Sequence, residues 1–257
     1  MTEEKAQKKP LVSVVMPAFN AEATIVSAIK SVCAQTMTDW ELIVIDDGST
    51  DETCRIVRRM AREDARIRLL YNGENRGTAY SRNRGLALSR GAYVALLDSD
   101  DLWRPEKLAR QIALAEKTGA DLIYSSYGII DEAGQRCCRD YLVPESVDER
   151  CLLRENVIGC STVLLKARAA EHCRFSERFY HEDYALWLRL LGEGFRFAGT
   201  AEVLADYRLR RDSRAFDKVS SARRRWQVYR EMDLSLPERS WCLTCYALSG
   251  MRKYRRI

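Results

Sequence analysis

Three carboxylates stand close together in the stretch ALLDSDDLW, residues 95–103. An apolar run stops at Asp98, and Asp100 and Asp101 follow after a single serine. Carboxylates at this spacing repel one another, and Mg²⁺ or Mn²⁺ would offset the repulsion because these cations prefer hard oxygen ligands. A bound cation would also neutralise charge on a departing diphosphate. The alternative is a cluster of helix N-caps, and Asp101 suits that alternative best, as a cap for the turn before Pro105.

Two further acidic pairs and one aromatic residue could take part in the same chemistry. Asp46 and Asp47 follow an apolar run, where a carboxylate could bond a base or a ribose, or could cap a helix. Glu182 and Asp183 open an amphipathic run. A carboxylate at a helix N-terminus stays ionised, which suits capping or the role of general base toward a hydroxyl. Phe19 in PAFN could stack on a base or could lie in the core.

Alternating apolar and amphipathic runs predict the elements that position these residues. Helices of about ten to fifteen residues between buried strands indicate an α/β fold with a doubly wound, mostly parallel, Rossmann-like sheet. Such sheets bind ligands at the carboxyl ends of their strands, where PAFN, DDGS and DSDD all fall. The strands are expected at 11–17, 41–47, 66–72, 92–98 and 120–131, with helices at 22–35, around 53–60, around 79–88 and from Pro105.

The second half of the sequence is less regular. A strand is expected at 156–166, a helix at 181–194, extended structure at 195–209 and two helices at the end. No sharp domain boundary is visible. We divide the chain into a polar tail (1–10), a main domain (11–215, with halves 11–131 and 132–215) and a basic helical extension (216–257).

Composition narrows the class of protein. The 257 residues carry a formal net charge of +5, and the arginines gather in the last third. That distribution favours an anionic partner (phosphate, nucleic acid or anionic lipid), or is simply a solvated helix face. The nine cysteines are odd in number and irregularly spaced, and no apolar segment follows the polar start, so reduced thiols in the cytoplasm are expected. No run approaches the roughly 20 apolar residues that span a bilayer.

The order and spacing of the motifs resemble the family 2 glycosyltransferases of the GT-A fold, from about Leu11 to about Ser213. The stretches NVIGCSTVLLK and EDYALWLRLL are most similar to the polysaccharide branch, of the teichuronic acid type. The resemblance implies an inverting transferase that uses a nucleotide-diphosphate sugar, expected to be a UDP-sugar, with Mn²⁺ or Mg²⁺. It also implies an irregular acceptor-binding half and a polyprenyl-diphosphate-linked saccharide acceptor, used in cell-surface polysaccharide synthesis at the inner face of the cytoplasmic membrane.

Carried over position by position, the resemblance assigns a role to each candidate residue. Asp183 matches the catalytic base. The nucleotide would be bound by Pro17, Ala18, Phe19, Asp47, Arg82 and Asp98. The metal would be bound by Asp100, the principal ligand, with Asp98. The diphosphate or the acceptor would be contacted by Glu182, Trp187, Arg208 and Arg210.

The chain departs from the family pattern at Arg210, where many relatives carry a histidine. Arginine does not ligate a metal, but it can fork onto phosphate oxygens. The alternative is an arginine that faces solvent. Residues 236–257 place an apolar stretch with Trp241 and Tyr246 beside a basic cluster. This composition suits a helix lying on a membrane surface, or one packing against the protein's own core or a partner.

Two other functions fit the sequence less well. A non-catalytic nucleotide-sugar-binding module would lack Asp100 or Asp183, and both are present. A nucleic-acid-binding protein would need aromatic residues interleaved with its basic ones, and none of the known motifs occurs. We therefore expect an enzyme and no nucleic-acid partner.

Overall fold

The structure is a computed structural model that describes residues 9–177, 182–209, 218–232 and 234–254. Its strands form one sheet in the order β3-β2-β1-β4-β7-β6-β8-β5. The strands are β1 Val12–Ala18, β2 Trp40–Asp46, β3 Ile67–Tyr71, β4 Tyr93–Leu96, β5 Leu102–Trp103, β6 Leu122–Ile130, β7 Leu164–Lys166 and β8 Phe197–Arg208. The helices are α1 Ile25–Cys33, α2 Thr53–Glu63, α3 Thr78–Ala87, α4 Lys107–Thr118, α5 Glu149–Arg154, the 3₁₀ turn η1 Cys160–Thr162, α6 Ala167–His172, α7 Glu182–Gly192, α8 Lys218–Glu231 and α9 Leu236–Tyr254.

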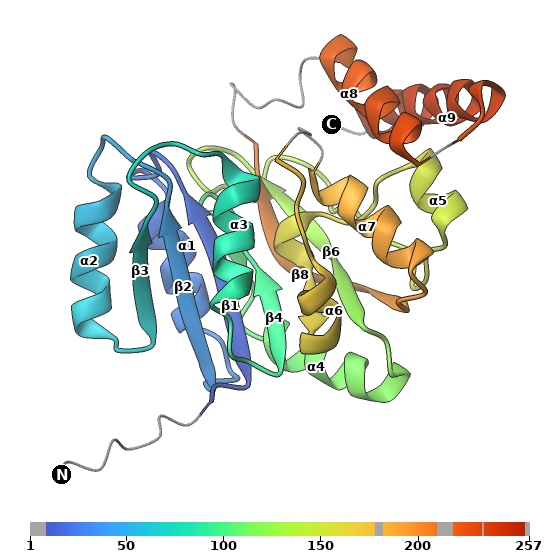
Figure 1. The fold of residues 1–257 in the computed structure, drawn as a ribbon. Helices are drawn as coiled ribbons and strands as arrows, with labels where there is room; N and C mark the ends of the chain where they lie inside the picture. Colours follow the sequence, from blue (N-terminus) through green and yellow to red (C-terminus); the bar gives the residue numbers. More distant parts are fainter. Residues whose placement is uncertain (1–8, 178–181, 210–217, 233, 255–257) are drawn as a thin grey trace.

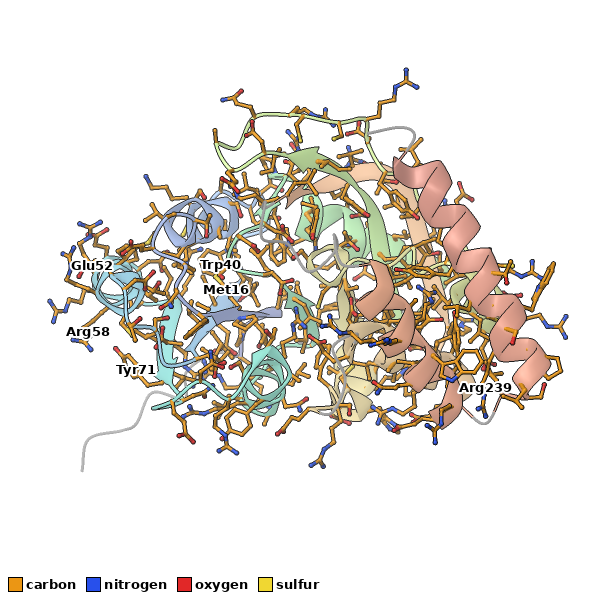
Figure 2. All side chains as sticks on the ribbon, turned by 90° about the horizontal axis from the view of Figure 1, so that it is seen from above. Met16, Trp40, Glu52, Arg58, Tyr71 and Arg239 are labelled. Atoms are coloured by element: carbon orange, nitrogen blue, oxygen red, sulfur yellow. The ribbon has the colours of Figure 1, made fainter. Side chains whose placement is uncertain are left out.

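Helices cover both faces of the sheet, which confirms the predicted doubly wound α/β class (Figure 1). Alternate residues of β1 belong to different cores, because successive side chains of a strand point to opposite faces. Val15 packs in the core beneath α3, α6 and α7, whereas Val14 and Met16 pack beneath α1, α2 and α4. Figure 2 shows Met16 in the interior, with Arg58 and Tyr71 at the α2–β3 edge, where the Arg58 guanidinium donates to the Tyr71 hydroxyl at 2.8 Å.

The sheet is mixed in its second half. Strands β3, β2, β1 and β4 are parallel, β7 runs antiparallel between β4 and β6, and β8 lies between β6 and β5. The halves 11–131 and 132–215 therefore share one sheet, with β7 and β8 interleaved among earlier strands. Because β8 and β7 return beside β5 and β4, residues far along the chain reach the carboxylate cluster.

The expected strand at 156–166 is only partly correct, because β7 covers 164–166 alone. The 3₁₀ turn η1 precedes it. Side chains of this segment form hydrogen bonds to the nearby backbone, and the backbone before residue 164 does not pair with a neighbouring strand. The Thr162 hydroxyl donates to the Gly159 carbonyl at 2.7 Å, and the Ile158 amide donates to the Asn156 side chain at 3.2 Å. Such local bonds compete with strand pairing.

Gly85 lets α3 lie directly against the sheet. A β-carbon at this position would come within 2.4 Å of Val15 and 2.8 Å of Ile45. Glycine is otherwise unfavourable inside a helix, and here the close approach accounts for it. The contact fixes the height of α3 over β1 and β2, and with it the position of Arg82, which lies on the same helix.

The C-terminal helices pack against α5 and α7. Val228, Tyr229 and Cys242 are buried in the core beneath α7. The buried Arg225 guanidinium donates to the Tyr229 hydroxyl at 2.7 Å and lies over the ring of Tyr184 at 4.2 Å. Of the alternatives for this segment, packing on the protein's own core is thus confirmed for one face. None of the described helices combines the length and the apolar character that crossing a membrane requires.

Candidate active site

The loops after β1 and β2 are joined at the carboxyl edge of the sheet. The Asn20 amide donates to the Ser49 hydroxyl at 3.0 Å, and the Thr50 amide donates to the Asn20 side chain at 2.9 Å. Asn20 has a φ of 46°, a left-handed conformation that asparagine tolerates better than most residues. Phe19, next to it, is 44% exposed, so its ring is not a core side chain. Pro17 and Ala18 lie inside β1 and lead to this exposed ring.

Asp47 organises the carboxyl edge of the sheet from a buried position. Its carboxylate accepts hydrogen bonds from the amides of Arg76 at 3.0 Å and Gly77 at 2.8 Å, and from the Asn72 side chain at 2.6 Å. The carboxylate thus holds the loop between β3 and α3. Gly48 permits this arrangement, because it has a φ of 76° and a β-carbon there would come within 2.7 Å of the same loop.

Arg82 joins two of the acidic motifs. Its Nη2 donates to Asp98 Oδ1 at 2.5 Å, and its Nη1 donates to Glu182 Oε1 at 2.9 Å. The guanidinium is buried and lies 5.2 Å from the centre of the Phe175 ring. Burial opposes the charge, but the carboxylate of Asp98 in particular raises the pKa of Arg82 well above its usual value. A permanent cation therefore lies between the end of β4 and the start of α7.

Burial raises the pKa values of both Glu182 and Asp183, and the charge of Arg82 counteracts part of the rise. Asp183 accepts a hydrogen bond from the Tyr184 amide at 2.7 Å, in the first turn of α7. A carboxylate with a raised pKa is a stronger base than an exposed one. The position therefore suits the role of general base as well as that of a helix-terminal carboxylate.

The prediction that Asp101 caps the turn before Pro105 is wrong. Its buried carboxylate accepts hydrogen bonds from the Ser161 hydroxyl at 2.5 Å and from the Arg208 amide at 2.9 Å. Burial raises the pKa of Asp101 well above its usual value, and the neighbouring carboxylates of Asp100 and Asp98 add to the rise. The partners come from η1 and β8, so local sequence could not show them. Helix α4 begins only at Lys107, without a side-chain cap.

Asp98 and Asp100 form a donor set that fits a divalent cation. Both are half-buried at the carboxyl end of β4, and both offer hard oxygen ligands. Among the described residues no group of three acidic, histidine or cysteine side chains is gathered in the manner of an all-protein metal site. Mg²⁺ commonly needs only one or two carboxylates when substrate phosphates supply the remaining ligands.

Two of the residues expected to contact the diphosphate or the acceptor are not at the open edge. Trp187 is fully buried and lies edge-on to Phe175, with ring centres 6.3 Å apart. Arg208 is also buried, and its guanidinium donates to the carbonyl of Asp100 at 2.7 Å and to those of Asp131 and Glu132 at 3.0 Å. Both side chains therefore hold protein structure in place. Arg210 lies outside the described residues.

Sequence reasoning missed two residues of η1 and one before α7. Burial raises the pKa of the Cys160 thiol well above its usual value, and the charge of Arg82 counteracts part of the rise. Ser161 bonds Asp101, and the Phe175 ring faces Arg82. Cys160 and Phe175 lie about 80 residues or more from Arg82 along the chain, and Ser161 lies 60 residues from Asp101. Because the separations are this long, no periodic or local signal could reveal the contacts.

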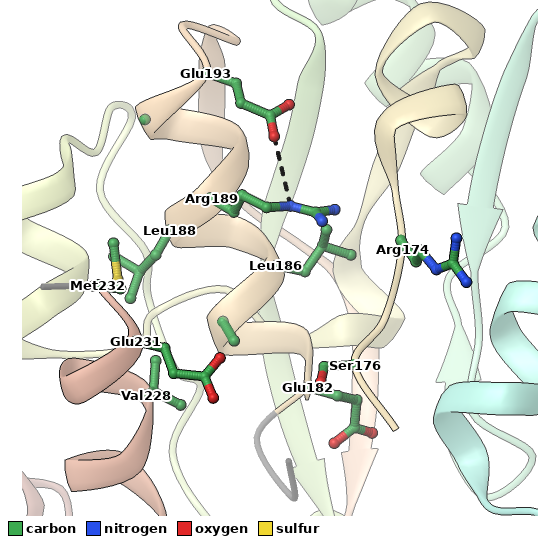
Figure 3. Close-up of a pocket in the computed structure, with 12 residues that line it drawn as sticks. Arg174, Ser176, Glu182, Leu186, Leu188, Arg189, Glu193, Val228, Glu231 and Met232 are labelled. Carbon is green, nitrogen blue, oxygen red and sulfur yellow. Dashed lines mark ion pairs between the residues drawn. The ribbon is translucent and has the colours of Figure 1, made fainter. Parts of the chain in front are cut away.

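A pocket of about 520 Å³ begins beside Glu182 and runs along α7 (Figure 3). Glu182 lies at one end and Glu193 at the other. The apolar wall is formed by Ala185, Leu186 and Leu188 of α7 with Val228 and Met232 from the α8 side. The polar lining consists of Arg174, Ser176, Glu182, Arg189, Glu193 and Glu231. Its volume is in the range of small-molecule binding sites.

Residues 13–166 match the family described as Glycosyl transferase family 2. TuaG of Bacillus subtilis, a glycosyltransferase named for teichuronic acid biosynthesis, is 35% identical over 246 residues, which cover 95% of this chain and 98% of TuaG. WfgD of Escherichia coli, a UDP-Glc:alpha-D-GlcNAc-diphosphoundecaprenol beta-1,3-glucosyltransferase, is also 35% identical, covering 95% of each chain.

The fold is likewise that of solved glycosyltransferases. A mannosyltransferase from Pyrobaculum calidifontis, in complex with GDP-Man and Mn²⁺, superposes with a TM-score of 0.69 over 93% of this chain and 69% of the other, at 18% identity. The motifs, the sheet and the match over most of the chain agree with one another, and they identify this protein as a glycosyltransferase that belongs to family 2 and has the GT-A fold.

Proposed function

We propose that the protein transfers a sugar from a nucleotide-diphosphate sugar, a UDP-sugar, to a hydroxyl of a lipid-linked acceptor, with inversion at the anomeric carbon. The observation that carries the proposal is the bridge from Arg82 to both Asp98 and Glu182. The bridge brings Asp98, which is expected to bind the donor, beside helix α7, which carries the expected base Asp183. The names of WfgD and TuaG support a UDP-sugar donor, a diphosphoundecaprenol acceptor and a role in polysaccharide biosynthesis.

In this mechanism Asp183 takes the proton from the acceptor hydroxyl. The oxygen then forms a bond to the anomeric carbon from the face opposite the diphosphate, the carbon–diphosphate bond breaks, and the nucleoside diphosphate leaves. Phe19 offers an exposed ring for the base, and Asp47 shapes the adjoining loop. A divalent cation held by Asp98 and Asp100 would supply positive charge for the leaving diphosphate.

The exchange of Asp183 for Asn tests the proposed chemistry. Asp183→Asn keeps the shape of the side chain but removes the base, so we expect transfer to fall by about 10²–10⁴-fold, the usual contribution of a positioned general base. Radiolabelled sugar transfer to a lipid-diphosphate saccharide measures the loss, and calorimetry with UDP and Mn²⁺ should show nearly unchanged nucleotide binding. Turnover at the wild-type rate would remove Asp183 from this role.

The pocket along α7 supports a place for the acceptor. Glu182 lines the pocket and precedes Asp183, so an acceptor held there would lie beside the base. We expect Ala185→Phe, which fills the apolar wall, to raise the KM for the acceptor several-fold while the affinity for UDP stays the same. Ala109→Phe, on the exposed side of α4, is the matched control. An unchanged acceptor KM in Ala185→Phe would place the acceptor elsewhere.

We also propose peripheral membrane contact through the outer side of α9. Trp241 is 62% exposed and Leu236 is 65% exposed, although the opposite side of the helix is packed on the core. The sequence that follows is basic, and each basic residue near an anionic surface contributes about 1 kcal/mol. A lipid-linked acceptor would favour such a location, on the cytoplasmic face of the membrane.

A further inference from the structure

One hydroxyl, that of Ser161, contacts both ends of the carboxylate cluster that follows β4. Ser161 Oγ accepts a hydrogen bond from the Asp98 amide at 3.1 Å and donates to Asp101 Oδ2 at 2.5 Å. Ser161 and Asp101 are both buried. The hydroxyl therefore spans the cluster from its first acid to its last, and the segment that carries Asp100 lies between the two bonds.

Strand β8 completes the support on the other side. The Arg208 amide donates to the second oxygen of Asp101 at 2.9 Å, and the Arg208 guanidinium donates to the Asp100 carbonyl at 2.7 Å. One contact fixes the main chain of Asp100 and the other fixes the carboxylate of Asp101, and neither involves the carboxylates of Asp98 and Asp100. Among these supports, only Ser161 reaches the Asp98 amide and the Asp101 carboxylate with one side chain.

The turn that presents Ser161 is itself fixed by the segment that follows the acids. The Trp103 indole donates to the Ser161 carbonyl at 2.8 Å, and the Gln111 amide group donates to the Thr162 carbonyl at 2.7 Å. Lys107, fully buried, lies 3.4 Å from the Val163 carbonyl and 4.1 Å from the centre of the Trp103 ring. Three successive carbonyls of the turn thus receive side chains from residues 103–111. A rigid turn can hold the Ser161 hydroxyl in one place.

We propose that Ser161 is a positioning residue for the donor-binding acids. Its hydroxyl holds the Asp98–Asp101 segment so that the carboxylates of Asp98 and Asp100 are arranged, before binding, for a cation and the donor diphosphate. The proposal rests on the proposed function, because it assumes that these acids bind a metal-dependent nucleotide. It adds a residue that touches neither the donor nor the cation but sets the affinity for both.

The test compares two variants that each lose one buried hydroxyl of the same turn. Ser161→Ala removes the bonds to the acids, whereas Thr162→Val removes only the bond to Gly159 and is the matched control. For Ser161→Ala we expect calorimetry with UDP and Mn²⁺ to show an affinity about 10-fold lower, the lower end of the usual effect of such supporting groups. The donor KM should rise by a similar factor, with kcat at saturating donor nearly unchanged.

Three controls separate positioning from a general loss of structure. Ser161→Ala and Thr162→Val should have unfolding temperatures similar to each other when no ligand is present. Thr162→Val should bind UDP and Mn²⁺ with an affinity within about two-fold of wild type. Ser161→Thr keeps the hydroxyl and should recover most of the affinity. Equal affinity in Ser161→Ala and wild type, or an equal loss in Thr162→Val, would overturn the inference. If wild type itself shows no Mn²⁺-dependent UDP binding, the proposed function fails first.

Discussion

Asp100 lies half-buried beyond the end of β4, and its main chain is fixed by Arg208 at 2.7 Å. Asp100→Asn keeps the size of the side chain and removes the charge that a hard cation prefers. We expect UDP binding in the presence of Mn²⁺ to weaken by at least about 10-fold, while the weak binding measured in chelator stays the same. Calorimetry with and without Mn²⁺ measures both. Glu106→Gln, an exposed acid just past the cluster, is the control. A variant that keeps its Mn²⁺ dependence would exclude Asp100 as a ligand.

At the scale of single residues, charge and spacing predicted the acids but not their partners. Asp98 and Asp100, which the resemblance assigned to the donor and the metal, do lie at the sheet edge, and Glu182 reaches the same place through Arg82. The buried role of Asp101 could not be predicted, because its partners lie 60 and 107 positions away. Ser161 and Cys160 gave no signal, since a serine or cysteine inside an apolar stretch is equally compatible with a buried strand.

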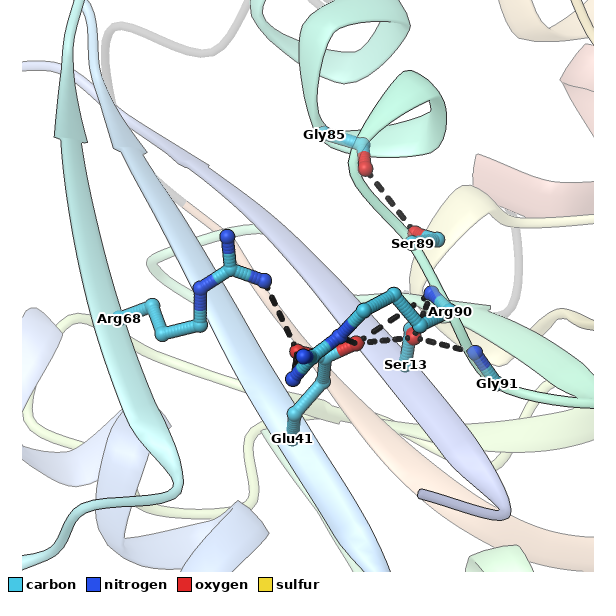
Figure 4. Close-up of polar contacts among 7 residues, drawn as sticks. All are labelled: Ser13, Glu41, Arg68, Gly85, Ser89, Arg90 and Gly91. Atoms are coloured by element: carbon cyan, nitrogen blue, oxygen red, sulfur yellow. Dashed lines mark hydrogen bonds and ion pairs between the residues drawn. The ribbon is translucent and has the colours of Figure 1, made fainter. Parts of the chain in front are cut away.

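The elements at the amino end of the sheet are joined by one buried acid, Glu41 (Figure 4). Its carboxylate accepts hydrogen bonds from the Ser13 hydroxyl at 2.8 Å and from Arg68 and Arg90 at 2.9 Å each. Ser13 Oγ in turn accepts from the amides of Arg90 and Gly91 at 2.9 Å. Strands β1, β2 and β3 and the turn before β4 therefore meet at this carboxylate, far from the carboxyl edge that carries the site.

Burial alone would raise the pKa of Glu41, but the hydrogen bonds from Arg90, Ser13 and Arg68 outweigh it and lower the pKa below its usual value. A lowered pKa means that the ionised form stabilises the fold above the unfolded-state pKa of Glu, about 4.3, and that this contribution is lost as the pH falls through the folded-state pKa. We expect Glu41→Gln to lower the free energy of unfolding by about 2 kcal/mol at pH 7. Urea denaturation should show the gap to wild type narrowing in acid, and a gap that is independent of pH would contradict the expected role of the charge.

Continuous apolar runs predicted the strands β1 and β2, which are buried on both faces, and apolar residues at helical spacing predicted the helices of the first half. The apolar pattern failed at 156–166, where an apolar composition suited a strand but the hydroxyl of Thr162 and the amide of Asn156 bond the local backbone. The mixed pairing of β7 and β8 also could not be predicted. Strand direction depends on long-range connections, and no single stretch of sequence records them.

For the molecule as a whole, the C-terminal helices are part of the folded body and not a detachable anchor. Cys242 is buried, and the ring of Tyr246 lies 4.3 Å from the Arg225 guanidinium. Deleting the segment after Ser235 would expose this core, so a truncated protein cannot separate membrane binding from loss of structure. A substitution on the exposed side of α9 separates them.

Trp241 is the side chain for that substitution, since it is 62% exposed and its amphipathic ring suits the headgroup region of a bilayer. We expect Trp241→Ser to reduce flotation with vesicles of anionic phospholipid several-fold, with the thermal unfolding temperature and UDP binding unchanged. Leu142→Ser removes a comparably exposed apolar side chain, 65% exposed, from the loop between β6 and α5 and should leave flotation unchanged. Because electrostatic attraction is screened by salt, the binding that remains in Trp241→Ser should fall further at higher ionic strength. Equal flotation of Trp241→Ser and wild type would show that this side of α9 does not meet the membrane.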